Sequence, residues 1–423
     1  MAALLAGCGS SFEAPQMLKP APQPNSVASV SLSDTSFNFG ETLVGSPLQK
    51  SVVTVTNTGA LPVMLNPALT GDASYSIVTA QSCGTQLAPG AGCAVQVIYA
   101  PTVGSAPASQ TAVLNLNFSN VATGTPSTVQ LTGTSAVMAA GTVTATTNPQ
   151  VALYTITPPF AGNVTVSFGT TQNYGLQTWS VPTPSGGGPV GIEVAGMLAN
   201  TAYHLRATVA FQNGVSANDI DHTFTTGNVL APSIASLPGQ KIPQIASTTT
   251  PGMTPQGGIE MMNPIVGQPA IVATDMQGNI IWTYDPPDPL NGSQWYAPKQ
   301  LPDGDFIALA SVTSSSVING PPPANALSVV REFDLIGNTI KQITMDQLNA
   351  KLAAANYNIT LLTFHHDVTV LPNGHWLVLA NTEKSVVLNG ATTPTKVLGD
   401  VIVDLDTNLN VAWVWNEFDH LDP

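Results

Sequence analysis

The sequence has few charged residues, and basic residues are especially scarce. Asp, Glu, Lys and Arg together account for 8% of the 423 residues, where soluble proteins usually have about 25%. The 10 Lys and Arg residues form no cluster and are outnumbered by 24 Asp and Glu, which gives a formal net charge of −14. Because proteins bind phosphate backbones with clustered Lys and Arg, nucleic acid is excluded as a partner. Hydrophobic residues still reach 43%, so the chain can build packed cores.

Long apolar runs are also missing. No segment reaches the roughly 20 apolar residues of a spanning helix, so we expect the bulk of the chain to be soluble. At the start, Leu5-Ala-Gly-Cys8 resembles the lipobox of bacterial lipoproteins, in which the cysteine is acylated and becomes the N-terminus. The polar, Pro-rich residues 9–27 are typical of a tether, and the basic part of a signal peptide is missing, so we expect a clipped precursor. This predicts lipidation of Cys8 and a lipid anchor in the bacterial cell envelope, in the periplasm, at the outer membrane or at the cell surface; a chance match is the alternative.

Only two other cysteines are present, Cys83 and Cys93, and they flank a Pro-Gly turn. In an oxidising compartment we expect them to form a disulfide that stabilises the fold by about 2 to 3 kcal/mol. The alternative is a pair of buried free thiols. No nearby His or third Cys completes a ligand set, so no metal site is predicted.

The residues that are abundant favour β structure. The 36 Gly and 35 Pro, with many Thr, Ser, Val and Asn, are typical of short strands and tight turns. The length predicts two to four domains. Residues 28–135 alternate apolar and polar positions with period two, which predicts a β-sandwich. Their motifs FGxxxxG, VTVTNTG, CGxxLAPGxxC and VQLTGT resemble the Ig-like domains of the ASPM-SPD-2-hydin and choice-of-anchor D type, which implies a spacer or an interaction module.

Residues 137–227 predict a second sandwich. Its segment Leu198-Ala-Asn-Thr-Ala-Tyr203 resembles the tyrosine corner of fibronectin type III folds, which implies a structural role for Tyr203. His204 alternates outward, so we expect it in a solvated strand position. The run Gly186–Gly188 does not follow the strand-to-helix pattern of a phosphate loop, so no cofactor is predicted there.

Residues 228–423 contain a loose repeat. Asp275, Asp334 and Asp406 each begin a tight turn between two predicted strands, and Leu-Pro-Asp-Gly304 and Leu-Pro-Asn-Gly374 mark a second kind of turn. Two hairpins per unit make four strands, and repeated four-stranded units predict propeller blades, of which about three are visible. One helix is expected at roughly Met345 to Ala355, capped by Thr344.

The adjacent pair His365-His366, followed by Asp367, is the strongest candidate for chemistry. In the repeat register these residues lie on the first strand of a blade, which lines the channel of a propeller. Neighbouring side chains of a strand point to opposite faces, so one histidine can enter the channel while the other packs between blades. The alternative is a structural pair bonded to Asp367 and the backbone. The corresponding residues of the preceding unit are Trp295 and Tyr296, so the register does not demand histidine, which favours function.

The segment from about residue 230 to the end resembles the bacterial arylsulfotransferase (aryl-sulfate sulfotransferase) family. The resemblance rests on Phe364-His-His-Asp367, on Leu371-Pro-Asn-Gly374, on the hairpins ending in Trp282 and Trp413, and on the tail from Trp415 to Pro423. It implies a six-bladed propeller that moves a sulfuryl group from an aryl sulfate to a phenol without a cofactor. It also implies a ping-pong mechanism through a sulfohistidine, with His365, His366 and Asp367 in the site.

The family's remaining site residues, including the histidine that accepts the sulfuryl group, are expected after Pro423. The resemblance therefore implies a chain truncated within an incomplete propeller and inactive as it stands. His420 and His375 are weak candidates for catalysis. A glycosidase-like site built from Asp367, Asp404, Asp406 or Asp419 is a further alternative, but the sequence places no two of them at a catalytic separation. A non-catalytic, surface-anchored adhesion or ligand-binding protein is the competing class.

Overall fold

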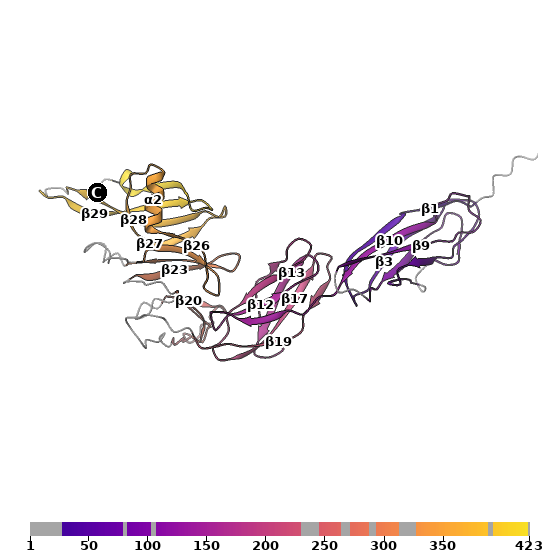
Figure 1. Ribbon diagram of the computed structural model, residues 1–423, viewed down its shortest axis with the longest axis horizontal. Helices are drawn as coiled ribbons and strands as arrows, with labels where there is room; N and C mark the ends of the chain where they lie inside the picture. Colours follow the sequence, from indigo (N-terminus) through magenta and orange to yellow (C-terminus); the bar gives the residue numbers. More distant parts are fainter. Residues whose placement is uncertain are drawn as a thin grey trace, which may run out of the picture. The chain divides into compact units, whose positions relative to one another are not determined.

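The computed structural model describes residues 28–78, 83–102, 107–229, 245–263, 271–286, 293–312, 327–387 and 392–421. Regular structure in these segments is nearly all β, so the predicted all-β class is confirmed (Figure 1). None of the described helices is long and apolar enough to cross a membrane. The chain divides into two compact units, residues 1–137 and 138–423. Cys8 and the predicted tether lie outside the described residues.

The first unit contains two four-stranded sheets around one core. One sheet has the order β1 (Val30–Leu32), β3 (Leu48–Asn57), β8 (Gly92–Tyr99), β6 (Tyr75–Ile77). The other has the order β2 (Ser36–Leu43), β10 (Thr128–Ala136), β9 (Ala108–Asn115), β5 (Ala68–Gly71). A small third sheet pairs β4 (Val63–Met64) with β7 (Gln86–Leu87). Alternate residues of β8 and β10 are buried in the shared core, as the period-two pattern predicts. The Ig-like assignment stays a prediction.

Cys83 and Cys93 are joined by a disulfide, with Cα atoms 5.4 Å apart. Cys93 belongs to β8, and both cysteines pack against the core of the unit. The bond therefore closes the loop that leads from the edge of the core into one of its central strands.

The second unit begins with two further sheets. One has the order β11 (Thr142–Ala145), β12 (Ala152–Ile156), β16 (Val190–Val194). The other contains β14 (Leu176–Gln177), β13 (Gly162–Gly169), β17 (Ala202–Phe211) and β18 (Ser216–Asn218), with β15 (Val181–Pro182) on β13 and β19 (His222–Thr225) on β17. The phenol of Tyr203 accepts a 2.9 Å hydrogen bond from the Leu198 amide, which confirms the predicted tyrosine corner. His204 is half-buried, and its Nδ1 lies 2.7 Å from Asp221 Oδ2, so it is less solvated than expected.

Three antiparallel sheets follow, each formed by strands that are consecutive in the sequence. The first has β20 (Glu260–Met262), β21 (Ile271–Thr274) and β22 (Ile280–Tyr284). The second has β23 (Gln294–Gln300), β24 (Phe306–Ser311), β25 (Val329–Phe333) and β26 (Thr339–Thr344). The third has β27 (Leu361–Val370), β28 (Trp376–Val386), β29 (Thr395–Leu405) and β30 (Val411–Asn416), and the 3-10 helix η1 (Glu417–Asp419) ends it. The predicted four-stranded units are present in the second and third sheets, while the propeller stays a prediction.

Both kinds of predicted turn form as the sequence chemistry requires. Asp275, Asp334 and Asp406 each accept the backbone N–H of the asparagine four residues later, and the amide of that asparagine bonds the second carboxylate oxygen. In the two Leu-Pro turns, the Leu301 amide donates to the Asp305 carbonyl at 2.7 Å and the Leu371 amide to the His375 carbonyl at 2.8 Å. The first strands of the two four-stranded sheets therefore enter equivalent turns.

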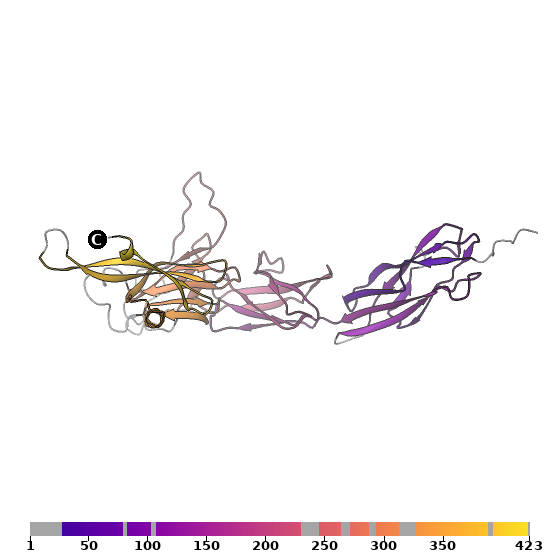
Figure 2. The ribbon, with the colours of Figure 1, turned by 90° about the horizontal axis from the view of Figure 1, so that it is seen from above.

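Helix α2 (Met345–Ala354) joins the second sheet to the third, and Figure 2 shows it almost end-on. Thr344 caps it: the hydroxyl accepts from the Gln347 amide, and the Gln347 side chain accepts from the Thr344 amide, which confirms the predicted cap. Leu348 and Leu352 are buried in a core shared by β24, β25, β27, β28 and β29. This core fixes β27 against the second sheet.

A separate core joins the second sandwich to the first and second sheets. It includes Val151 from the sandwich together with Trp282 and Trp295. Two buried side chains of the sandwich also donate across this border: Asn148 Nδ2 to the Thr283 carbonyl at 3.0 Å, and Gln150 Nε2 to the Ile280 carbonyl at 3.1 Å. The sandwich and the sheets are thus packed together within the second unit.

Candidate functional site

The predicted His-His-Asp segment lies in a bulge of β27. Phe364 pairs with Ala380 of β28, and Val368 pairs with Val378, so three residues stand opposite Leu379 alone. These three are His365, His366 and Asp367. His366 has φ +54, a left-handed conformation that non-glycine residues rarely adopt. Bulges of this kind redirect side chains and are frequent beside active sites.

The neighbouring strand β23 has a similar but shorter bulge. Tyr296 pairs with Leu309 and Lys299 with Ile307, so Ala297 and the following proline stand opposite one residue. Ala297 has φ +49, close to the value at His366. Counted from the turns, Leu309 and Leu379 occupy the same place in their sheets.

The predicted match of Trp295 and Tyr296 to the two histidines is therefore wrong by one residue. Tyr296 is equivalent to His365, and Ala297 is equivalent to His366, because the bulge of β27 contains one residue more than that of β23.

His365 is mostly buried, with 13% of its side chain exposed. Its Nε2 lies 3.2 Å from Asp400 Oδ1 on β29, and apart from this ion-pair contact the nitrogen has no hydrogen-bond partner within the described segments. Burial, together with the neighbouring His366, lowers the pKa of His365 below its usual value of about 6.5, although Asp400 opposes the shift. The ring is therefore neutral near pH 7.

His365 also bonds the backbone of Ala380, and this bond raises the pKa of the ring because it favours the protonated form. Asp400 acts in the same direction, so burial and the neighbouring His366 outweigh both partners.

His366 is exposed, and its ring stands edge-on to that of His365, with centroids 4.9 Å apart. Asp367 is also exposed, but its carboxylate contacts are with other groups: Oδ1 lies 2.6 Å from Lys299 Nζ and 2.9 Å from the Val368 amide. In the structural alternative, the two histidines were expected to bond Asp367 and the backbone. In the described part of the chain the carboxylate beside His365 is Asp400 instead.

Sequence reasoning missed Asp400, Asn381 and Lys299. Asn381 pairs with Asp400 across β28 and β29, is 5% exposed, and its Oδ1 has no hydrogen-bond partner among the described residues. His365, which contacts Asp400, and Asn381, which pairs with Asp400 along the strands, each have one polar atom without a hydrogen-bond partner among the described residues. No local motif marks these residues, since they come from different strands.

The weaker candidates have other partners. His375 Nδ1 lies 2.9 Å from Asp404 Oδ1, and the His420 ring stacks on Trp415 at 5.3 Å. Asp406 is bonded within its hairpin, and Asp419 belongs to η1. Nothing in these contacts builds the glycosidase-like pair of carboxylates considered above.

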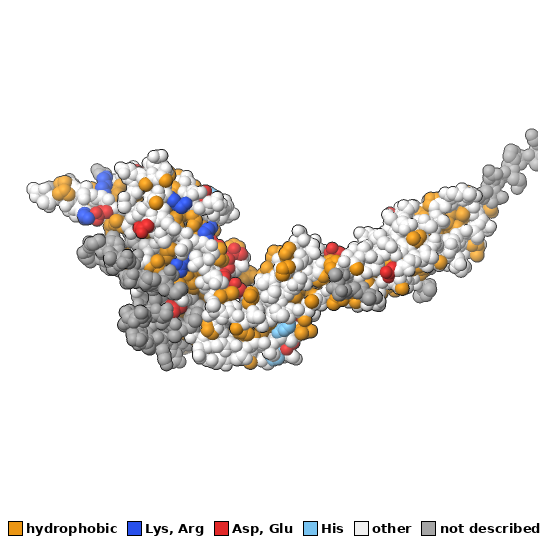
Figure 3. Space-filling view, in the orientation of Figure 1, with side chains coloured by type: hydrophobic (Ala, Val, Ile, Leu, Met, Phe, Trp, Pro, Cys, Tyr) orange, Lys and Arg blue, Asp and Glu red, His pale blue; other side chains and the backbone are white. Residues whose placement is uncertain are grey.

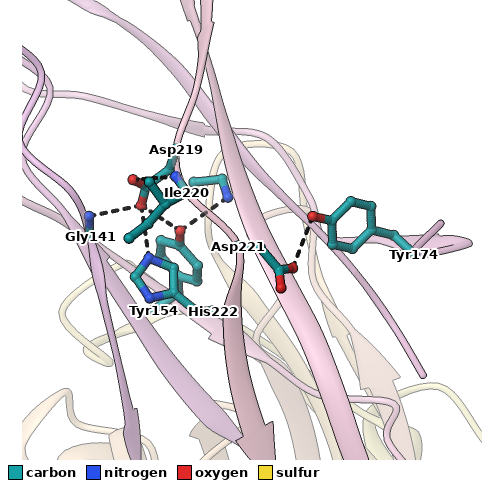
Figure 4. A network of polar contacts seen from close by, with 8 residues as sticks. Gly141, Tyr154, Tyr174, Asp219, Ile220, Asp221 and His222 are labelled. Carbon is teal, nitrogen blue, oxygen red and sulfur yellow. Dashed lines mark hydrogen bonds and ion pairs between the residues drawn. The ribbon is translucent and has the colours of Figure 1, made fainter. Parts of the chain in front are cut away.

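A second histidine and carboxylate pair, which sequence reasoning also missed, lies inside the second sandwich (Figure 4). Asp219 Oδ2 accepts from Tyr154 Oη at 2.6 Å and from the Gly141 amide at 2.8 Å, and lies 3.2 Å from His222 Nε2. Asp219 Oδ1 accepts from the Ile220 amide at 2.7 Å. Burial would raise the pKa of Asp219, but these bonds outweigh it, so the pKa lies below its usual value.

Acidic side chains also gather where the sandwich meets the sheets (Figure 3). Asp303, Asp305 and Glu332 place carboxylate oxygens within 4.8 Å of one another, close enough to share a cation. Burial and the neighbouring carboxylates raise the pKa of Asp305 to about 6. On the sandwich side, burial and Asp334 raise the pKa of Glu193 to about 7. Lys341 Nζ lies 3.6 Å from Glu332 Oε2 and offsets part of this negative charge.

Comparison with known proteins bears on the last three sheets. Residues 245–423 match the family model of arylsulfotransferase (ASST), which confirms the resemblance seen in the sequence. No curated protein matches the chain.

Several solved structures align with parts of the chain at low scores. A protein of unknown function from Porphyromonas gingivalis W83 is 16% identical over 27% of this chain and 50% of that chain, with a TM-score of 0.21. The PapD-like domain 7 of human CEP192 is 13% identical over 31% of this chain and 99% of its own, also with a TM-score of 0.21. The CupB2 chaperone of Pseudomonas aeruginosa is 12% identical over 45% and 99%, with a TM-score of 0.19. The chain thus spans half the length of the first of these proteins, and such scores carry no conclusion about function.

Proposed function

We propose that the segment 245–423, which belongs to the arylsulfotransferase family, contributes to the transfer of a sulfuryl group from an aryl sulfate to a phenol. The observation that carries the proposal is His365, a neutral imidazole with an unbonded Nε2 in a strand bulge. Asp400 lies beside it and stabilises the ring whenever it takes a proton.

The chemistry requires a group that exchanges protons with phenols. When the S–O bond of the donor breaks, the departing phenolate takes a proton, and the acceptor phenol loses one as it attacks sulfur. In the ping-pong route that the family resemblance implies, an S–N bond to a histidine forms in the first half and breaks in the second. An imidazole whose pKa lies below about 6.5 is unprotonated at neutral pH and can accept the proton of an incoming phenol. The imidazolium formed in this way returns the proton to the phenolate that departs in the next turnover, so the protons balance over one full exchange.

His366 has a different place in this proposal. It is exposed beside His365, and its left-handed backbone orients it away from a regular strand position. We assign to it a direct contact with the substrate, because a non-glycine residue is held in this conformation only where the surroundings favour it, and such residues cluster at functional sites.

The test is the rate of transfer from a chromogenic aryl sulfate to a phenol acceptor by the full-length gene product. We expect His365→Ala to lower turnover by about 10²-fold, as is usual for the loss of an acid/base group. His375→Ala is the matched control, because it removes another histidine that is paired with an aspartate in the same sheet. Wild-type turnover in both His365→Ala and His366→Ala would contradict the proposal.

We also propose that Cys8 carries a lipid anchor and that the preceding sandwiches act as spacers between the membrane and the sheets. The supporting observations are the Leu5–Cys8 motif for the anchor and, for the spacer, the hydrogen bonds that occupy Asp219 and leave no free catalytic group there. Cys8→Ala in a precursor with a complete signal sequence should release the protein from membranes. Retention of this variant in the membrane fraction would count against the anchor.

A further inference from the structure

The two neighbouring first strands contact one another at their bulges. In β23, Lys299 follows the left-handed Ala297 by two residues, so the bulge precedes this lysine directly. Lys299 Nζ reaches β27, where it lies 2.6 Å from Asp367 Oδ1 and 3.2 Å from Thr369 Oγ1. Asp367 is the last residue of the bulge in β27, and Thr369 lies two residues beyond it. The cationic Lys299, next to the bulge of β23, therefore contacts the end of the bulge of β27.

The opposite end of the β27 bulge is held by the same neighbouring sheet. The Phe364 amide donates to Ser328 Oγ at 3.3 Å, and Thr363 Oγ1 bonds Ser311 Oγ. Ser311 ends β24, and Ser328 directly precedes β25. His365 and His366 thus lie between two groups of contacts, both made by the second sheet.

The conformation between these contacts is one that the chain would not adopt unaided. The left-handed φ of His366 is unfavourable for a residue with a side chain, and it persists where surrounding contacts over-determine it. The Ser311 and Ser328 contacts are buried or partly buried, whereas Lys299 and Asp367 are 39% and 52% exposed. Such an exposed pair adds little to overall stability, so its effect is expected on local geometry.

We propose that Lys299 is a positioning residue for the site: it holds Asp367 and Thr369, and so keeps His366 in the bulged conformation used in sulfuryl transfer. The inference has two halves. Its catalytic half, the effect of Lys299 on sulfuryl transfer, rests on the proposed function. Its structural half, the dependence of His366 on Lys299, stands independently of any reaction.

The structural half is tested by NMR on the chain with histidine labelled at ¹³Cε1, which gives one signal for each of the six histidines. His366→Gln assigns the signal of His366. We expect Lys299→Met, which keeps the aliphatic stem, to shift this signal, and Lys299→Arg to restore it. The matched control is Lys396→Met, which removes another exposed ion pair of the third sheet, 2.7 Å from Glu383. Raising the ionic strength to about 1 M should shift the wild-type signal in the same direction, because salt screens exposed pairs.

The catalytic half is tested by steady-state kinetics of the same substitutions made in the full-length gene product. We expect Lys299→Met to lower kcat by about tenfold or more while KM for the aryl sulfate changes little, since misplacing a reacting group costs rate rather than binding. Lys299→Arg should recover most of kcat, and Lys396→Met should match the wild type. If Lys299 has only a structural role, every variant that remains folded should have the same kcat as the wild type.

The outcomes separate the two proposals. An unchanged His366 signal in Lys299→Met overturns the inference, whatever the activity. A shifted signal with an unchanged kcat overturns its catalytic half. A full-length wild-type protein that transfers no sulfuryl group overturns the proposed function and with it the catalytic half, while the NMR result still decides whether Lys299 positions His366.

Discussion

The second sandwich and the third sheet each contain a histidine beside an aspartate, but the two pairs differ in how completely they are bonded. Asp219 receives bonds from Tyr154, Gly141 and Ile220 in addition to its contact with His222. His365, by contrast, approaches Asp400 with an Nε2 that has no hydrogen-bond partner among the described residues. Residue types alone would rank these pairs as equal. The unfilled bonding capacity separates a group available for chemistry from one used for stability.

The strands that carry the two pairs also differ, in how regularly they pair with their neighbours. His222 lies on β19, which pairs with β17 in regular register. His365 lies in the bulge of β27, where pairing is interrupted between Phe364 and Val368. A regular strand buries and bonds its side chains on a fixed face, while a bulge frees a short segment from that alternation.

The largest expected effect on stability separates the two aspartates. Asp219→Ala should lower the free energy of unfolding by about 2 to 4 kcal/mol, because it leaves buried donors without an acceptor. Asp400→Ala should change it by no more than about 0.5 kcal/mol, since the Asp400 side chain is 53% exposed. Denaturant unfolding of both variants measures the difference. Equal losses in the two variants would remove the distinction drawn between the pairs.

Two carboxylates should make the free energy of unfolding depend on pH in opposite directions. Because the pKa of Asp219 is lowered, its contribution is present above about pH 4 and is lost as the pH falls through the lowered pKa. The pKa of Glu193 is raised to about 7 by burial and by the nearby Asp334 and Asp305. Stability from protonated Glu193 is therefore greatest below about pH 4.3 and declines as the pH rises toward 7.

Glu193→Gln isolates this second contribution. The glutamine carbonyl can still accept from the Leu335 and Ile336 amides that bond Glu193, but it does not titrate. Melting temperatures measured from pH 5 to pH 8 should fall less with rising pH in the variant than in the wild type. If the melting temperatures of the variant and the wild type change equally with pH, the titration of Glu193 does not affect stability in this range.

A further effect on stability, smaller than that of Asp219→Ala, is expected at the cap of α2. Thr344→Ala removes the hydroxyl that accepts from the Gln347 amide and should lower the free energy of unfolding by about 1 kcal/mol. Like Asp219, this is a saturated polar site, so sulfuryl transfer should remain at the wild-type rate. A loss of activity without a loss of stability would show that saturation is a poor guide to function.

Features set by local chemistry could be predicted from the sequence. The Asp-to-Asn hairpins, the Thr344 cap and the Tyr203 corner each depend on residues within a few positions of one another, so the residue types are sufficient. The Cys83 and Cys93 pairing, closed over a short loop, belongs to the same class.

The site itself needed information that sequence spacing does not contain. The extra residue in the β27 bulge is visible only from pairing with β28, and it shifts the match to β23 by one position. Asp400 reaches His365 and Lys299 reaches Asp367 from other strands, and Asp219 is bonded to residues 65 and 78 positions away. Such contacts depend on how sheets pack, which local propensity does not determine.

The most direct measurement of the central claim is an NMR titration of the His365 and His222 rings, with and without an aryl sulfate. We expect His365 to titrate below pH 6.5 and its signal to move when the aryl sulfate is added, while the His222 signal should not respond to the aryl sulfate. A His365 ring that titrates at or above pH 6.5 and does not respond to the aryl sulfate would contradict the account.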